Sequence, residues 1–336
     1  MISRKDIVVV GGIVLLLIVF FGLNLFSGDA NIPLQEAWSL LWGGVVENTS
    51  WSYIMEERLL RTINAALSGG ALAFSGLVLQ SFFRNPLAGP GVLGVSSGAS
   101  VGVAAGILAT GFVAEWTGLF SQYALGAIGA FSVLVVLIIL NKWIKGVTLL
   151  VIGLMISFFA SSFVNLLLNL ANDAQTRRYV EWGFGSFSSV SHETFGWYAL
   201  VLIAVILFGI FYFPKLLNAW VYGEQQVIAS GFSLSRGRLM IVLTLGILIT
   251  LVTLQCGPVS FIGIAVPQLI RLLFKSVHHL VLLIASFVGG ALIAVLADFI
   301  LRNAGLPLPL NAITALFGAP VIIFVIIRSS KKQIGI

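Results

Sequence analysis

The chain has 336 residues, of which 59% are hydrophobic and only 9% are charged, and its mean hydropathy is +1.09. Because a soluble globular domain carries about 25% charged residues, this composition excludes a water-covered globule and predicts an all-α polytopic membrane protein. The net charge of +6 is therefore interpreted as a signal of membrane topology rather than of nucleic-acid binding, and a single Cys excludes a disulfide framework.

Ten stretches are candidate membrane spans, since a span needs about 20 mainly apolar residues. The first follows Arg4 and Lys5 and is longer than the apolar core of a usual signal peptide, so it is kept as a span. The stretch 258–275 is short and holds two prolines, which leaves a re-entrant segment as the alternative. The connection 170–193 is long and amphipathic, and a short surface helix is expected there. The ten candidates are 7–26, 59–82, 91–111, 119–140, 146–169, 194–213, 239–256, 258–275, 280–301 and 309–327.

Charge placement favours ten spans with both termini in the cytoplasm. In this arrangement 13 of the 18 basic residues lie on the cytoplasmic side, and 10 of the 12 acidic residues lie on the outer side. This bias follows the positive-inside rule, whereas nine spans would place the basic C-terminal tail outside.

Five basic residues lie on the outer side against this trend: Arg58, Arg61, Arg177, Arg178 and Arg302. One interpretation is contact with lipid headgroups or local pairing, such as Asp298 with Arg302 at i,i+4 spacing. The other is an outward basic cluster that docks an acidic partner. Arg58 and Arg61 are three residues apart and share one helix face, which favours a joint role.

The span 91–111 carries four glycines at strict four-residue spacing, namely Gly94, Gly98, Gly102 and Gly106. Small residues on one face let another helix approach closely, so we predict that these glycines pack against a neighbouring helix. The same stretch matches the G-x-S-x-G pattern of a hydrolase nucleophile elbow. That motif needs a strand-to-helix turn and a His partner, so an intramembrane serine hydrolase using Ser96 or Ser97 is the less favoured alternative.

The span 146–169 has a polar face formed by Gly153, Ser157, Ser161, Asn165 and Asn169. Asn is costly in contact with lipid, so this face is expected to meet another helix or to line a water-filled path. It holds no Lys, Asp or Glu, whereas ion-coupled carriers use intramembrane ionisable groups. An ATP-independent secondary transporter is therefore less favoured but stays open.

Two further motifs are missing from the sequence. No G-x-x-x-x-G-K-[ST] P-loop occurs, so any ATP hydrolysis must come from another subunit. His278 and His279 are adjacent, point apart on a helix and have no nearby carboxylate or Cys, so no metal site is expected.

The one substantial cytoplasmic connection is 214–238. A short amphipathic helix is expected over about 216–229, with Gly231 as its stop signal. This helix either lies on anionic lipid or docks a cytoplasmic partner.

Four motifs together resemble the permease subunits of the FecCD family of ABC importers, and the resemblance covers about residues 50–330. They are RLLRT at 58–62, FRNPLAGPGVLGVSSGAS at 83–100, GPVSFIGIAVPQLIRLL at 257–273 and LPLNAITALFGAP at 308–320. The sequence departs from the family pattern at Leu60, Gln268, Leu308 and Asn311, and in the coupling region at Gln226, Val227 and Ser230.

The resemblance implies one transmembrane permease domain over 1–336 with the type II ABC importer architecture, in the cytoplasmic (inner) membrane of a prokaryote. It implies a permease homodimer or paralogous heterodimer, two cytoplasmic ATPase subunits and an extracytoplasmic binding protein. No nucleic-acid partner is expected, and lipid surrounds the spans. The chain is expected to be no enzyme and to bind no cofactor, because ATP and Mg²⁺ are used by the partner ATPase. Ferric siderophore is the first expectation for the cargo, with haem and cobalamin carried by close relatives.

The same resemblance gives three sets of residues a role. The family presents arginines to acidic residues of its binding protein at the positions of Arg58, Arg61 and Arg302. Its central path is lined at the positions of Ser157, Ser161, Asn165 and Asn169. Region 216–231 falls on the element that couples to the ATPase, with matching positions at Gly223, Glu224, Gln225 and Gly231.

Overall fold

The computed structural model describes residues 4–28, 30, 32–42, 49–109, 119–140, 143–144, 147–190, 192–274, 276, 278–304 and 308–334. Within these ranges every regular element is a helix. The ends of the expected spans at 110–111, 146 and 275 lie outside the described residues.

The helices fall on all ten expected spans. Seven are long and apolar enough to cross a membrane, namely α1, α3, α5, α6, α8, α10 and α12, and shorter apolar helices lie in α4, α11 and α13. In chain order the elements are α1 Arg4–Phe26, α2 Leu34–Leu41, α3 Thr49–Phe83, the 3-10 helix η1 Pro90–Leu93, α4 Val95–Ala109, α5 Leu119–Leu140, α6 Val147–Asn169, α7 Asp173–Gly183, α8 His192–Val221, α9 Glu224–Ala229, α10 Leu234–Cys256, α11 Ile262–Leu273, α12 His279–Asn303 and α13 Leu310–Ile334.

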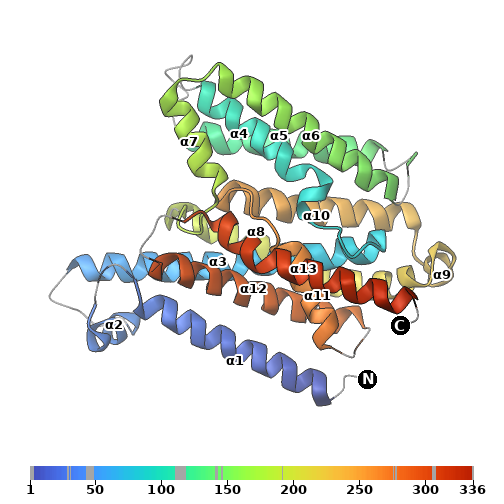
Figure 1. Ribbon diagram of the computed structural model, residues 1–336, viewed down its shortest axis with the longest axis horizontal. Helices are drawn as coiled ribbons and strands as arrows, with labels where there is room; N and C mark the ends of the chain where they lie inside the picture. The colour runs from blue at the N-terminus through green and yellow to red at the C-terminus, as the bar shows by residue number, and fades with distance from the viewer. Residues whose placement is uncertain are drawn as a thin grey trace.

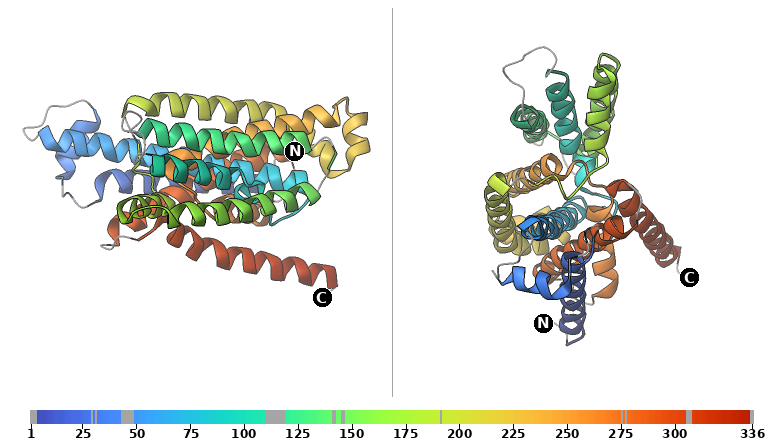
Figure 2. Two further views of the ribbon diagram at one scale, coloured as in Figure 1. Left: turned by 90° about the horizontal axis from the view of Figure 1, so that it is seen from above. Right: turned by 90° about the vertical axis from the view of Figure 1, so that its left-hand side faces the viewer.

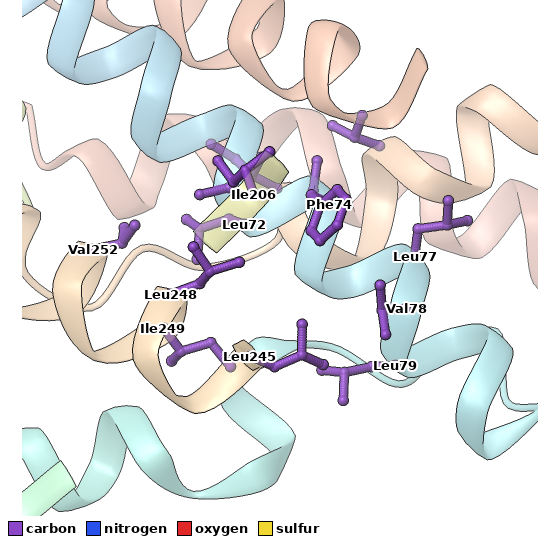
Figure 3. Close-up of a cluster of buried hydrophobic side chains, with 14 of the residues drawn as sticks. Leu72, Phe74, Leu77, Val78, Leu79, Ile206, Leu245, Leu248, Ile249 and Val252 are labelled. Atoms are coloured by element: carbon purple, nitrogen blue, oxygen red, sulfur yellow. The ribbon is translucent and has the colours of Figure 1, made fainter. Parts of the chain in front are cut away.

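Helix α3 is the centre of the fold. It packs against α8, α10, α11 and α12, and the end-on view in Figure 2 shows it surrounded by other helices. Lipid tails are as apolar as the side chains between these helices, so close packing rather than exclusion from water holds them together. Figure 3 shows the contact of α3 with α8 and α10 through Leu72, Phe74, Leu77, Val78 and Leu79 of α3, Ile206 of α8, and Leu245, Leu248, Ile249 and Val252 of α10.

The long helices run side by side and give the bundle two distinct ends (Figure 1). The start of α1, the end of α13 and the short helix α9 lie at one end, which we call the α9 end. Helices α2 and α7 lie at the other, which we call the α2/α7 end. Helices α4, α5 and α6 form a layer of their own, which α10 joins to the rest through contacts with α4 and α5.

Two expectations about the connection 214–238 are wrong. Helix α8 does not end before Pro214 but continues to Val221, because proline is tolerated in membrane helices where neighbouring groups replace the lost hydrogen bond. The helix expected over 216–229 is broken at Gly223, whose φ of 117° starts the separate helix α9. Residues 216–220 therefore belong to the largely buried end of α8, and α9 follows as a separate helix at the end of the bundle.

The segment 258–275 contains a helix too short to cross a bilayer alone. The twelve residues of α11 span about 18 Å at 1.5 Å per residue, against a hydrocarbon core of about 30 Å. Residues 257–260, before α11, have no regular secondary structure, and Phe261 directly before the helix has a φ of 66°. Such irregular backbone is tolerated at membrane depth where protein covers it; here Gly263 lies against Gly76 of α3 and Pro90 of η1.

The surface helix expected within 170–193 is α7. Asn172 and Gln175 form a reciprocal capping box at its start, which satisfies two backbone donors of the first turn. Arg177 and Glu181 form an exposed i,i+4 ion pair on it, and none of its described side chains is buried.

Candidate functional site

The three arginines predicted from the sequence meet in one cavity at the α2/α7 end. Arg58 and Arg61 come from α3 and Arg302 from the last turn of α12, and Glu57 and Ile54 complete the wall. The cavity holds about 210 Å³ and is open to one side. Its described lining residues include three guanidinium groups and one carboxylate, that of Glu57.

The three arginines are not equally accessible. Arg58 is only 4% exposed and donates hydrogen bonds to the backbone oxygens of Leu25, at 3.1 Å, and Ala30, at 2.6 Å. Arg302 donates to the backbone oxygen of Asn24 at 2.7 Å and is half-buried. Arg58 therefore joins α3 to the end of α1, whereas Arg302 is better placed to meet another molecule.

The sequence suggested an ion pair between Asp298 and Arg302, but Asp298 pairs with Arg61 instead. Asp298 lies 2.7 Å from Nη2 of Arg61 rather than in an ion pair with Arg302. This contact joins α3 to α12 across the bundle, whereas an i,i+4 pair would have stayed within α12. The sequence spacing alone did not reveal it.

The polar face of α6 lines a second cavity. Ser157, Ser161 and Asn165 form one wall, and Asn169 lies beyond it and donates to the backbone oxygen of Asn165 at 2.8 Å. The cavity holds about 330 Å³, and none of the described residues that line it is charged. Hydroxyl and amide groups therefore supply its polarity.

The opposite wall of this cavity was missed in the sequence. It consists of Ser97 and Ser100 from α4 and Tyr179 from α7. Partial burial raises the pKa of Tyr179 above its usual value. The sequence singled out Ser97 as a candidate nucleophile of the G-x-S-x-G stretch, not as part of a cavity. The one sequence signal for this wall was the three-residue spacing of Ser97 and Ser100, which places both on one helix face.

The residues expected to couple to an ATPase lie in and around α9. Gly223 precedes it, Glu224 and Gln225 form its first turn, and Gly231 follows it with a φ of 82°. Glu224 forms an ion pair with Arg238 of α10, whose guanidinium also lies 5.9 Å from the ring centre of Trp220. Arg238, which the sequence did not single out, thus fastens α9 to the bundle, while Gln225 stays exposed.

The four spaced glycines do not act as a single stripe. Gly94 precedes α4, has a φ of 76° and lies against Gly153 of α6. Gly98 and Gly102 lie within α4 against the backbone of α5, where a Cβ on Gly102 would approach the oxygen of Leu125 to 1.9 Å. Gly106 is buried in α4. Because the backbone bends at Gly94, this glycine contacts α6, whereas Gly98 and Gly102 contact α5.

Ser96 has no histidine partner in the described structure. Its hydroxyl lies 3.0 Å from that of Thr253 on α10, and the strand-to-helix turn of a nucleophile elbow is replaced by η1 and the start of α4. This geometry gives no base that could activate the serine.

Comparison with known proteins places the chain among permeases. The model of the FecCD transport family matches residues 15–328. A hemin transport system permease protein of Yersinia pestis is 29% identical over 329 residues, which is 96% of this chain and 97% of the relative. A vitamin B12 import system permease protein of Klebsiella pneumoniae is 32% identical over 328 residues, which is 96% of this chain and 94% of the relative.

The fold also matches a solved structure. A chain of a metal-chelate type ABC transporter in an inward-facing conformation superposes with a TM-score of 0.83 at 24% identity, and the match covers 95% of this chain and 99% of the other. At this identity the likeness concerns the fold alone.

Proposed function

Because the chain belongs to the FecCD transport family and is a permease subunit of an ABC importer, we propose that it carries a bulky metal chelate across the membrane. The proposed cargo is a ferric siderophore, with haem and cobalamin as related chelates, since two relatives are named for hemin and vitamin B12. The chain is a transport component that works with a separate ATPase and a binding protein.

The uncharged cavity between α4, α6 and α7 is the observation that carries this proposal. The polar groups among its described lining residues are serines, Asn165 and Tyr179, which offer weak hydrogen bonds and carry no fixed charge. Such a surface does not hold a large amphipathic chelate tightly, and transport needs binding that is weak enough for release. We propose that Ser157, Ser161 and Asn165 line the path and that Asn169 lies at its edge.

The assembly is proposed to be a permease homodimer, or a heterodimer with a paralogue, bound to two ATPase subunits and one binding protein. ATP binding would move α9 and rock the helices around the path between two states. The chain itself is proposed to bind no cofactor, because ATP and Mg²⁺ belong to the ATPase. It is an integral membrane protein, and we propose the cytoplasmic (inner) membrane of a bacterium as its location.

The cavity at the α2/α7 end is proposed as the docking site for the binding protein. Arg61 and Arg302 would meet acidic residues there, and this role is supported by the cavity that both line and by the partial exposure of both side chains. Arg58 is buried, so its proposed part is to hold the end of α1 beside the docking site. At the α9 end, exposed Gln225 and the turns at Gly223 and Gly231 present α9 to the ATPase.

Uptake in cells tests the cargo. A strain that lacks the chain is supplied with radioiron as a ferric siderophore, with haem, or with labelled cobalamin, and is then complemented. The proposal predicts that complementation restores uptake of one of these chelates. Restored uptake of a free ion, with no effect on any chelate, would contradict it.

A further inference from the structure

A third cavity lies at the α9 end of the bundle and contains two positive charges. It is formed where α3, α8 and α11 end, holds about 380 Å³ and is lined in part by Arg84, Gln268 and Arg271. This size falls within the range of small-ligand pockets. Both of its charged lining residues are arginines.

The charges of these arginines are not balanced by a described carboxylate. The ion pairs found in the described residues involve neither of them. Arg84 donates to the backbone oxygen of Trp220 at 2.6 Å, and Arg271 donates to Oγ of Ser81 at 2.8 Å. A guanidinium group has five N–H donors, so one contact uses only part of this capacity. Two such groups at one cavity favour an anion, and arginine pairs especially well with phosphate.

Arg271 is held in place by a buried chain of hydrogen bonds. Ser81, which accepts from Arg271, also lies 3.0 Å from Nε2 of His279, and Nδ1 of His279 lies 2.7 Å from Oδ1 of Asn218. Ser81 and His279 are 5% and 2% exposed. The position of the guanidinium is therefore fixed before any ligand arrives, which lowers the cost of binding.

Arg84 is held by an unusual backbone. It follows α3 with a φ of 51°, a conformation in which glycine is the usual residue after a helix. A positive φ strains the backbone of an arginine, and residues with a strained backbone cluster at functional sites. In this position its side chain reaches the end of α8 and the cavity.

Exposed apolar side chains lie on α11, which carries Arg271, and on the neighbouring α12. Leu272 and Leu273 follow Arg271 directly on α11, and Leu280 and Ile284 lie in the first turns of α12, which packs against α11; all four are exposed. A positive cavity beside an exposed apolar surface, at the ends of membrane helices, matches a molecule with a negative head and an apolar tail. Basic pockets between membrane helices bind acidic phospholipid headgroups in this way.

We propose that this cavity binds the phosphate group of an anionic phospholipid through Arg84 and Arg271. The headgroup would occupy the cavity, and an acyl chain would run along the exposed leucines of α11 and α12. The lipid would then bridge the end of α8, from which α9 follows, to α11.

Native mass spectrometry of the full-length chain tests this proposal. The chain is purified in mild detergent and titrated with phosphatidylglycerol, cardiolipin or phosphatidylcholine. The wild type is expected to retain an anionic lipid and not phosphatidylcholine. The double variant Arg84→Gln/Arg271→Gln should bind it at least about tenfold more weakly, because two charge-assisted contacts are lost. Arg236→Gln, which removes an exposed arginine at the start of α10 in the same region, should bind like the wild type.

A photoreactive phosphatidylglycerol gives a readout that does not depend on a variant being stable. Cross-links to peptides containing 80–86 and 268–273 are expected. Equal lipid retention by the double variant and the wild type, or cross-links elsewhere only, would overturn the proposal. Displacement of the lipid by an equal concentration of inorganic phosphate would also overturn the proposal, because it would identify a site for free phosphate. Cross-linking of the cavity to an acidic segment of the ATPase, with no lipid retained, would identify a protein partner instead.

Discussion

One carboxylate oxygen of Asp298 on α12 contacts two side-chain nitrogens of Arg61 on α3. Nε and Nη2 of Arg61 lie 2.8 and 2.7 Å from Oδ1, and Oδ2 is buried with no hydrogen-bond partner among the described residues. The Asp298 side chain is fully buried, whereas 24% of the Arg61 side chain is exposed. The pair thus links the cavity at the α2/α7 end to the interior of the bundle.

Removing one member of this pair should destabilise the fold more than removing both. We expect Asp298→Ala to lower stability by about 2–3 kcal/mol, somewhat less than a fully buried pair, because water partly screens Arg61. The double variant Arg61→Met/Asp298→Leu should recover most of the loss. Thermal unfolding in detergent, followed by tryptophan fluorescence, measures both. A double variant less stable than Asp298→Ala would show that the pair is worth more than apolar packing.

Charge reversal at Arg302 should weaken docking without preventing membrane insertion. Arg302→Glu is expected to reduce the affinity for the binding protein at least about tenfold, because it replaces attraction to an acidic surface by repulsion. Arg178→Glu makes the same charge change on α7, at the same end but outside the cavity. Binding to the reconstituted permease is measured for both. Equal effects of the two variants would contradict a specific role for the cavity.

A bulky residue in the uncharged cavity should block transport. Ser161→Trp is expected to reduce uptake at least about tenfold, because the indole fills space between α4 and α6. Leu166→Trp places the same side chain at an exposed position of α6 that does not line the cavity, and should retain most of the uptake. Membrane levels of both variants are determined alongside. If Ser161→Trp transports normally, the path lies elsewhere.

A single methyl group on Gly102 should loosen the contact of α4 with α5. Its Cβ would meet the backbone oxygen of Leu125 at 1.9 Å, and backbone cannot move aside cheaply. We expect Gly102→Ala to cost about 1–3 kcal/mol, as overpacking does. Gly12→Ala is the control, because nothing lies within 4 Å of its added Cβ and alanine favours helix. The thermal unfolding midpoints of the two variants are measured in detergent. Equal midpoints would contradict a tight contact between α4 and α5 at Gly102.

The positions of the apolar helices were predictable because each span leaves a long hydrophobic run in the sequence. Where the chain bends inside the membrane, this signal was weaker. The short length and two prolines of 258–275 left a re-entrant segment open, whereas the bend at Gly94 was not predicted. Gly94 is covered by α6, and α11 is covered by α3 and η1; these contacts have no local pattern in the sequence. At Pro214 the local sequence predicted a helix end, but α8 continues through it to Val221 because the surrounding structure tolerates the proline.

The site residues were predicted less completely than the fold. Outward arginines stood out because they oppose the charge bias, yet their spacing did not show that Arg58 is buried or that Arg61 pairs with Asp298. The polar face of α6 was visible as a four-residue repeat, whereas Tyr179 and Ser100 complete the cavity from other helices. Contacts between distant segments have no signature in a single sequence.

Co-purification from native membranes tests the central claim most directly. The tagged chain is extracted in mild detergent, and every protein that accompanies it is identified and quantified. As an ABC importer permease it should bring with it a P-loop ATPase in a fixed stoichiometric ratio, and uptake into vesicles should require ATP. Recovery of the chain alone, with uptake that continues without ATP and stops when the proton gradient collapses, would contradict the account.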